Sequence, residues 1–245
     1  MYTAFAEVYD TLMRDVDYTA WSDFYTELLH SLGVENGEKI TECACGTGNL
    51  TLPLSYHFQM TGIDLSEDML SVAIGKARDA GRQIVFVRQD MAALRLHKPQ
   101  DAVLATCDGL NYLTSAKQAS GFFASAYRAL KPGGALIFDI STRYKLSQIL
   151  GDRFLSEETD DLCYFWQNAW DASRHRVHLR LDIFVRRENG LWQRITEQQV
   201  QQAWTPEELL PMMENAGFTD IRVYGDRRLS VSPKEERLHI AAIRL

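Results

Sequence analysis

Between residues 39 and 140 the chain alternates short apolar segments with segments of helical periodicity. Short runs that are hydrophobic on both faces, separated by helices, are typical of a parallel sheet that is buried on both sides. Because parallel strands need crossover connections, this order predicts helices on both faces of the sheet. We therefore expect an α/β fold with strands at 39–45, 60–65, 84–90, 101–107 and 134–140.

Beyond Ser141 the pattern changes to longer strands in which apolar and polar residues alternate. Asn189-Gly190 is a strong hairpin signal between two of these strands. We predict that residues 141–204 form a small antiparallel β insertion that caps the binding pocket, whereas 1–140 and 205–245 form the main domain. The predicted strands of the insertion are 163–171, 176–187 and 191–204.

The main domain resumes with a helix. Thr205 is placed as its cap, Pro206 at its first position and Glu208 three residues after the cap, and Gly217 ends it. Strand character then returns at 220–225 and 237–245.

The charge and hydropathy of the chain exclude several classes of protein. Acidic residues outnumber basic ones, 33 to 26, and the formal net charge of −7 disfavours nucleic-acid binding over the whole surface. Hydrophobic residues make up 46% of the chain, enough for a substantial core, so intrinsic disorder is excluded. The sequence has no long apolar segment and no apolar leader, so we expect a soluble, cytoplasmic protein.

The four cysteines are too few for a disulfide framework in a chain of 245 residues, and reduced, buried thiols are expected. Cys43 and Cys45 share one face of a strand. Zinc requires four ligands, however, and the sequence has no second cysteine pair. No metal site is predicted.

The residues that follow the first two strands carry a strong functional signal, because parallel sheets bind small molecules at the carboxyl ends of their strands. Gly46 and Gly48 follow the first strand and lack the Cβ that would block a ligand near the backbone. Asp64 ends the second strand, where a carboxylate is placed to accept both hydroxyls of a ribose. These residues predict a ligand that contains a nucleoside.

The next two strands extend this pattern. Asp90 and Met91 follow the third strand and are placed to hold an adenine, and Cys107 and Asp108 follow the fourth. A dinucleotide site prefers G-x-G-x-x-G, but Thr51 stands where the third glycine is expected. A nicotinamide-dependent oxidoreductase is therefore a weaker interpretation.

These segments resemble the class I S-adenosylmethionine-dependent methyltransferases over roughly residues 1–140 and again from about 205. The resemblance implies a Rossmann-like fold with a seven-stranded, mostly parallel sheet flanked by helices. Within the superfamily, the segments FAEVYDTLM and CDGLNYL are similar to a bacterial YqeM-like branch. Glu42 matches the acid of the family's first-strand pattern, whereas Ala44 replaces its first glycine and adds a methyl group beside the methionyl moiety.

The resemblance also implies which residues bind the cofactor, S-adenosyl-L-methionine. Asp64 is expected to hold the ribose hydroxyls, and Asp90 and Met91 the adenine. The turn after the first strand and the Cys107 region are expected to hold the methionyl end, under tyrosines of a lid-like N-terminal segment. The predicted cofactor-binding residues are Tyr9, Tyr18, Glu42, Ala44, Gly46, Gly48, Asp64, Leu65, Met69, Asp90, Met91 and Cys107.

Methyl transfer requires the nucleophile, the methyl carbon and the sulfur to lie nearly in line, and it needs no metal because the sulfonium already activates the carbon. The protein is expected to orient the acceptor and exclude water. The sequence assigns no catalytic base and does not distinguish N, O or C methylation. The predicted substrate-binding residues are Asp108, Asn111, Tyr112, Tyr144 and His178.

We predict a small-molecule acceptor, because the chain is acidic and the insertion is short for a nucleic-acid module. Two alternatives stay open. An RNA methyltransferase is one, since several arginines make the insertion locally basic. The other is a non-catalytic regulatory module that binds S-adenosylmethionine and uses exposed aromatic side chains as a contact surface.

Overall fold

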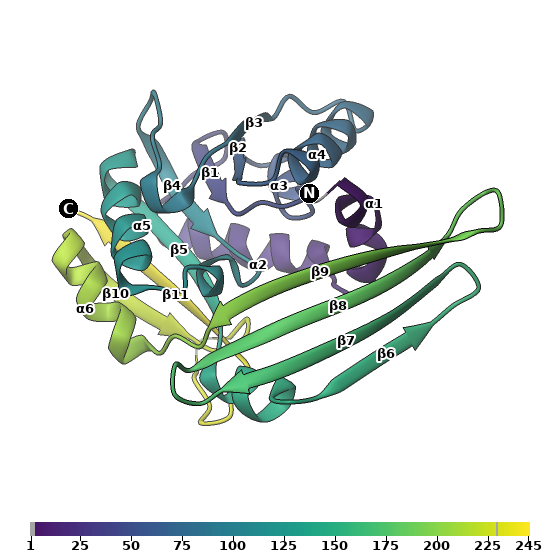
Figure 1. Ribbon diagram of the computed structural model, residues 1–245. Helices are drawn as coiled ribbons and strands as arrows, with labels where there is room; N and C mark the ends of the chain where they lie inside the picture. The colour runs from purple at the N-terminus through teal and green to yellow at the C-terminus, as the bar shows by residue number, and fades with distance from the viewer. Residues whose placement is uncertain (1–2, 229) are drawn as a thin grey trace.

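The computed structural model describes residues 3–228 and 230–245, and a seven-stranded sheet, here called sheet A, forms its centre (Figure 1). The strand order is β10-β11-β5-β4-β1-β2-β3. The five strands from β5 to β3 are parallel, and β11 runs antiparallel between β5 and β10. The prediction of a mostly parallel, seven-stranded sheet is confirmed. The strands are β1 (Lys39–Cys43), β2 (Gln59–Asp64), β3 (Val85–Arg88), β4 (Gln100–Ala105), β5 (Leu130–Ser141), β10 (Phe218–Tyr224) and β11 (Arg237–Arg244).

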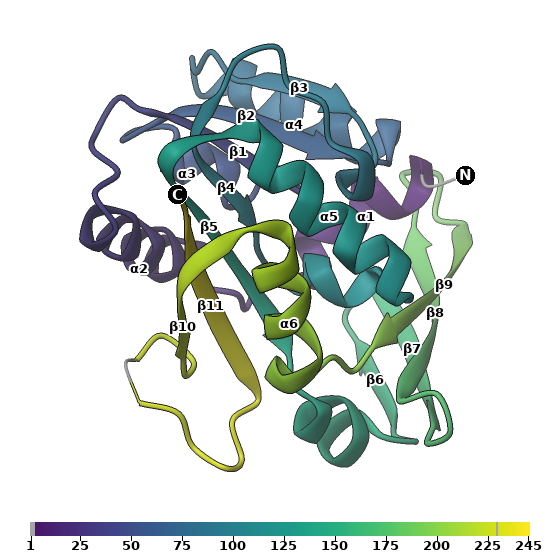
Figure 2. The ribbon, with the colours of Figure 1, turned by 90° about the vertical axis from the view of Figure 1, so that its left-hand side faces the viewer.

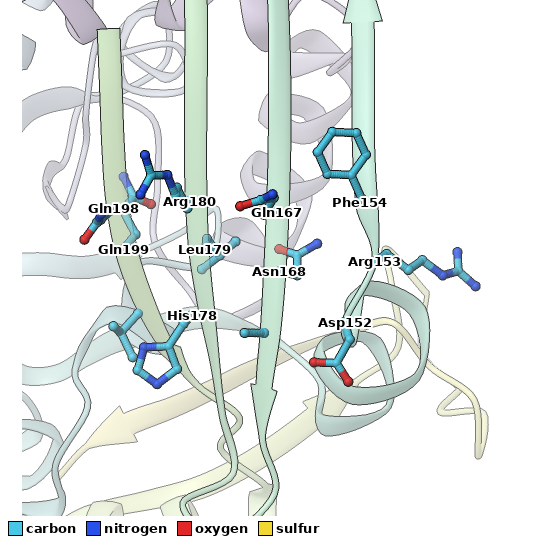
Figure 3. A pocket seen from close by; sticks show the side chains of 12 residues that line it. Asp152, Arg153, Phe154, Gln167, Asn168, His178, Leu179, Arg180, Gln198 and Gln199 are labelled. Carbon is cyan, nitrogen blue, oxygen red and sulfur yellow. The ribbon is translucent and has the colours of Figure 1, made fainter.

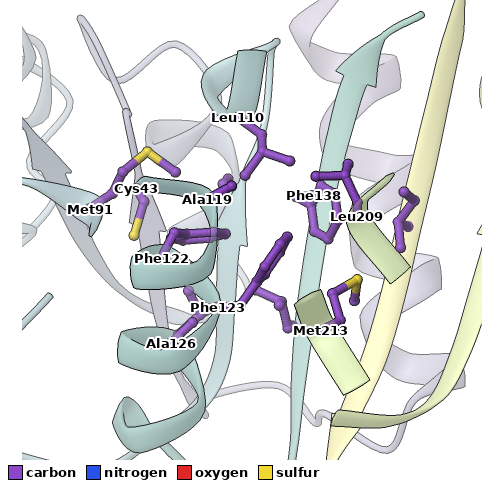
Figure 4. Packing of buried hydrophobic residues seen from close by; sticks show 14 of the residues in the cluster. Cys43, Met91, Leu110, Ala119, Phe122, Phe123, Ala126, Phe138, Leu209 and Met213 are labelled. Atoms are coloured by element: carbon purple, nitrogen blue, oxygen red, sulfur yellow. The ribbon is translucent and has the colours of Figure 1, made fainter. Parts of the chain in front are cut away.

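Helices cover both faces of sheet A, and alternate residues of its central strands point to opposite faces (Figure 2). Val103 and Phe138 pack on the side of α5 and α6, where Figure 4 shows the aromatic side chains of α5. Leu104 and Ile137 pack on the side of α2. Both faces of the strands are therefore apolar, as a buried parallel sheet requires. The helices are α1 (Thr3–Leu12), α2 (Tyr18–Ser31), α3 (Thr51–Leu54), α4 (Glu67–Asp79), α5 (Ala116–Ala129) and α6 (Pro206–Ala216).

A second, antiparallel sheet of four strands, here called sheet B, lies to one side of sheet A (Figure 1). A short turn around Asn189-Gly190 joins β8 to β9, with Gly190 at φ +79°, as the hairpin signal predicts. The strands are β6 (Phe154–Glu158), β7 (Leu162–Asp171), β8 (Arg176–Arg186) and β9 (Trp192–Gln202). The sequence did not predict β6 or the π-helical segment Lys145–Leu150.

Side-chain caps begin α4 and α6, and the cap of α6 is as the sequence predicts. The Ser66 hydroxyl accepts a hydrogen bond from the backbone N–H of Met69 at 3.2 Å and begins α4. Thr205 and Glu208 form a capping box at the start of α6, and Gly217 ends that helix at φ +106°.

Most predicted strand boundaries differ from the observed ones by one to four residues, and two of the differences have a clear cause or position. The first strand ends at Cys43 rather than residue 45, because Ala44 adopts φ +54° and turns the chain away from the sheet. The fifth strand begins at Leu130 rather than 134, directly after α5. Within the described residues, no helix combines the length and hydropathy needed to cross a bilayer.

Candidate active site

The turn after β1 leaves the sheet through backbone conformations that few residues adopt. Gly46 has φ +53° and Gly48 has φ +74°. A Cβ added to Gly46 would meet no atom within 4 Å, so open space lies beside this turn. A Cβ on Gly48 would lie 3.2 Å from the Cβ of Ala73 on α4, so a side chain at this position would be crowded. The helix that follows, α3, has four residues.

Asp64 connects the carboxyl ends of β1 and β2. One oxygen of its carboxylate accepts a hydrogen bond from the Gly46 N–H at 2.8 Å, and the other accepts from the Ser66 N–H at 2.9 Å. Each oxygen keeps a further lone pair for a ligand. The neighbouring Leu65 side chain is 60% exposed, although it is large and apolar. The carboxylate and the exposed leucine together fit the ribose end of an adenosine.

Glu42 lies at the base of this site and is buried. Its carboxylate accepts hydrogen bonds from the hydroxyls of Thr51 and Thr106, the latter at 2.7 Å. Burial raises the pKa of Glu42 to about 7, and the two hydroxyl hydrogen bonds oppose that rise. Because both oxygens are already bonded within the chain, Glu42 supports the turn from below.

The structure places Asp90 and Met91 differently from each other. Asp90 is exposed at the end of β3, and its carboxylate accepts a hydrogen bond from the Ala92 N–H at 2.8 Å. The Met91 side chain is buried in the core beside Cys43 (Figure 4). Asp90 is open to a ligand, whereas the thioether of Met91 packs against other residues of the core.

Helix α1 lies over the glycine turn. The Asp10 carboxylate accepts hydrogen bonds from Thr47 Oγ1 at 2.6 Å, Asn49 Nδ2 at 2.8 Å and Lys76 Nζ at 2.7 Å. Burial raises the pKa of Asp10, but these hydrogen bonds and the Lys76 charge lower it overall. Met69 of α4 packs in one cluster with apolar residues of α1. This set of contacts, here called the Asp10 latch, holds α1 against the cofactor side of the molecule.

A cavity of about 340 Å³, here called the inner cavity, lies between α1, the end of β4 and sheet B. Tyrosine, tryptophan and leucine side chains form about half of its wall. Five predicted site residues line it: Tyr9, Tyr18, Cys107, Asp108 and Tyr112. Burial raises the pKa of the Cys107 thiol, so it lines the cavity as a neutral group.

A buried ion network forms one end of the inner cavity. Cys107 and Asp108 have φ +54° and +66°, and their backbone N–H groups donate to the Asp139 carboxylate at 2.6 and 3.1 Å. The Arg237 guanidinium bonds both Asp108 and Asp139. Although burial raises the pKa of Asp108, the Arg237 charge lowers it overall. The sequence analysis missed Asp139 and Arg237, because they lie on strands far apart in the chain.

Three predicted substrate-binding residues do not line the inner cavity. Asn111 is buried, and its amide bonds the backbone of Ser141 and Gln202, so it ties the end of β4 to β5 and β9. Tyr144 precedes the π-helical segment outside the cavity wall. His178 belongs to a groove of about 630 Å³ on the outer face of sheet B, beside Arg180 (Figure 3).

The placement of His178 has a simple cause. Successive side chains of a strand point to opposite faces, and its neighbour Leu179 reaches the inner cavity. The aromatic residues of the insertion, which were expected to be exposed, also lie in different environments. Phe165 and Trp192 are exposed, at 39% and 48%, whereas Trp166 lines the inner cavity.

The doubly covered parallel sheet, the glycine turn and the acid at the end of β2 define a nucleoside-binding α/β enzyme. The model of the methyltransferase domain family matches residues 40–134. The chain belongs to the S-adenosylmethionine-dependent methyltransferases. Its cofactor is S-adenosyl-L-methionine, as the resemblance of the sequence implied.

Two bacterial relatives match nearly the whole chain. A protein of Bacillus subtilis (strain 168) that bears the name methyltransferase YqeM is 35% identical over 246 residues, which cover 99% of this chain and 96% of the relative. A protein of Geobacillus sp. (strain WCH70), also named as a methyltransferase, is 33% identical over 226 residues and 92% of both chains.

Solved structures share the whole architecture. The crystal structure of an S-adenosylmethionine-dependent methyltransferase from Clostridium acetobutylicum superposes with a TM-score of 0.89 at 30% identity, covering 99% of this chain and 98% of that one. DesVI from Streptomyces venezuelae has a TM-score of 0.80 at 19% identity over 98% of both chains. The similarity to DesVI concerns the fold alone, and it includes the region of sheet B.

Proposed function

We propose that this protein transfers the methyl group of S-adenosylmethionine to a small-molecule acceptor that binds in the inner cavity. The observation that carries the proposal is that one cavity has walls from both halves of the molecule. Cys107 and the tyrosines of the N-terminal segment come from the predicted cofactor side, and Leu179 and Leu181 come from sheet B. Residues 141–204 are thus the part of the chain that roofs the acceptor.

The cofactor supplies a methyl group on a positively charged sulfur. Asp64 is the residue we assign to the ribose hydroxyls, and Asp90, which is exposed at the end of β3, to the adenine. Tyr9 and Tyr18 border the cavity, where an electron-rich ring gains about 0.5–2 kcal/mol from a nearby cation. Glu42 and the Asp10 latch keep the turn and its cover in place.

The acceptor side of the cavity is suited to orientation and to exclusion of water. Leu12, Leu150 and Leu181 contribute apolar walls, and Tyr112 and Gln199 contribute polar groups at the rim. Holding two reactants in line lowers the entropic part of the barrier, and a dry site strengthens its electrostatic interactions.

An RNA acceptor is less well supported. The Arg237 guanidinium, one of two cations of the inner cavity, is bonded to Asp108 and Asp139 and is not free for phosphate. The net charge of −7 also opposes the long-range attraction that RNA binding uses.

The four cysteines are free, and Cys43 and Cys45 are buried. Reduced thiols support our proposal that the protein acts in the cytoplasm.

Transfer from methyl-labelled S-adenosylmethionine tests the proposed acceptor class. We expect label to enter a low-molecular-weight bacterial extract and not purified total RNA. Label in RNA alone would overturn the small-molecule assignment. Binding of the cofactor with no transfer to either fraction would favour the regulatory module.

A further inference from the structure

The inner face of sheet B carries one acid that the cofactor site does not use. Glu197 lies on β9 opposite Leu181 of β8, which in turn lies opposite Trp166 of β7. All three side chains line the inner cavity. Glu197 is 9% exposed, so most of the residue is withdrawn from solvent.

The Glu197 carboxylate forms no ion pair with a side chain of the described residues. Among residues 3–228 and 230–245, no Lys, Arg or His nitrogen lies within 4 Å of it. Burial raises the pKa of Glu197, and a hydrogen bond from the Gln199 side chain and the positive charge of the chain's N-terminal amino group oppose the rise. The Oε1 of Gln199 accepts from the Tyr112 hydroxyl at 2.8 Å, which leaves the amide N–H group for Glu197.

The other acid of the inner cavity, Asp108, is paired within the chain. Arg237 is paired with Asp108 and with the buried Asp139. The Lys145 charge acts on Asp108 and lowers its pKa, although burial and Arg237 have the larger influence on that group. Glu197 is thus the one acid of the cavity wall that lacks a cation within the described chain.

A buried carboxylate without a cation is costly unless a binding partner supplies the opposite charge. The aromatic walls point to the same partner, because the faces of tyrosine and tryptophan rings attract cations. Tyr9, Tyr164 and Trp166 all line the cavity that Glu197 faces.

We propose that Glu197 binds the ammonium group of the acceptor, and that the acceptor is a small amine with an apolar body. The apolar part lies against Leu179, Leu181 and Trp166, and the charged nitrogen lies at the carboxylate. This inference rests on the proposed function, since it concerns the acceptor of the same cavity.

Calorimetry with three matched probes tests the assignment. Phenethylamine, 2-phenylethanol and 3-phenylpropanoate share a phenyl ring and differ in the charge of the polar end. Each is titrated into the full chain with and without saturating S-adenosylhomocysteine. We expect phenethylamine to bind at least tenfold more tightly than the alcohol, and the carboxylate to bind most weakly. Glu197→Gln should remove the preference for the amine, whereas Glu188→Gln, which removes an exposed charge from the β8–β9 turn, should keep it.

The result overturns the inference if the wild-type chain shows no preference for the amine, if it binds the carboxylate more tightly, or if Glu197→Gln keeps the preference. The heat of S-adenosylhomocysteine binding is recorded first, so failure of the cofactor site is distinguished from failure of the amine assignment. Glu197→Gln is expected to melt no lower than wild type, since it removes a buried charge and keeps the side-chain shape; this controls for misfolding.

Discussion

Glu42 in sheet A and Glu197 in sheet B are both buried acids, but their surroundings differ. Hydroxyls of Thr51 and Thr106 bond both oxygens of Glu42. Glu197 faces the inner cavity and receives one hydrogen bond, from Gln199. Glu42 is therefore satisfied within the chain and supports the site without meeting a ligand. The acceptor side leaves a charge for the ligand to satisfy.

The two regions meet at helix α1. Asp10 bonds the glycine turn on one side, and Glu7 pairs on the other with Arg187, which directly follows β8 of sheet B. Residues that serve one region alone should therefore have separable effects, and residues of α1 should affect both.

The largest effect is expected at Asp139, which supports the boundary between the regions. Asp139→Ala removes the acceptor of two backbone N–H groups, the Tyr25 hydroxyl and the Arg237 guanidinium. Arg237 keeps Asp108 as a partner, but breaking one buried ion pair and leaving buried donors without an acceptor costs about 3–5 kcal/mol of unfolding free energy. Urea denaturation measures this loss. Asp79→Ala, at an exposed position of α4, is the control and should cost under about 1 kcal/mol.

Glu42→Gln tests whether the acid of sheet A is held in its protonated form. The folded-state pKa of Glu42 is raised from 4.5 to about 7. The wild-type chain therefore has its full unfolding free energy below pH 4.5 and loses part of it as the pH rises through about 7. Relative to Glu42→Gln, the wild-type chain should lose roughly 3 kcal/mol of unfolding free energy across that range. Parallel pH profiles of the two proteins would contradict this account.

Asp10→Ala tests the link between the two regions. The carboxylate is partly exposed, so removing the Asp10 latch should cost only about 1 kcal/mol, and hydrogen exchange of the α1 amides should accelerate about fivefold. Amides of β4 should not change. Because the pKa of Asp10 is lowered below 3.8, the latch is present above that pH and weakens as the pH falls below it. Unchanged exchange in α1 would show that packing alone holds the helix.

The smallest effect is expected at Ala44, where the chain departs from the glycine of the family pattern. Its φ of +54° is unfavourable for a residue with a Cβ. Ala44→Gly should raise the unfolding free energy by up to about 1 kcal/mol, whereas Ala124→Gly inside α5 should lower it by a similar amount. Thermal unfolding of both variants measures whether stability rises in Ala44→Gly and falls in Ala124→Gly. A loss of stability in Ala44→Gly would contradict the argument.

The cofactor side was largely predictable because its signals are local. Apolar runs identify the strands of sheet A, and Ser66, Thr205 and Gly217 mark helix ends through hydrogen bonds a few residues away. Asp64 is the last residue of its strand, and its carboxylate accepts a hydrogen bond from the Gly46 N–H.

The acceptor side was less predictable because it depends on which face of a strand each residue occupies. His178 was expected in the pocket, but the pleat turns it to the outer face. Glu197 was missed, although a hairpin centred on Asn189 pairs it with Leu181, whose apolar strand face was recognised. The strand β6 was also missed, since FLSEE has neither an apolar run nor an alternation.

The central claim is that the acid at the end of β2 and the glycine turn bind S-adenosylmethionine. Calorimetric titration of the wild-type chain, Asp64→Ala and the control Asp79→Ala tests it most directly. We predict saturable binding to the wild type and the control, and binding about 10- to 100-fold weaker to Asp64→Ala, as expected for the loss of hydrogen bonds worth about 1.5–3 kcal/mol to a charged group. Equal affinity in all three folded proteins, or no binding to the wild type, would contradict the claim.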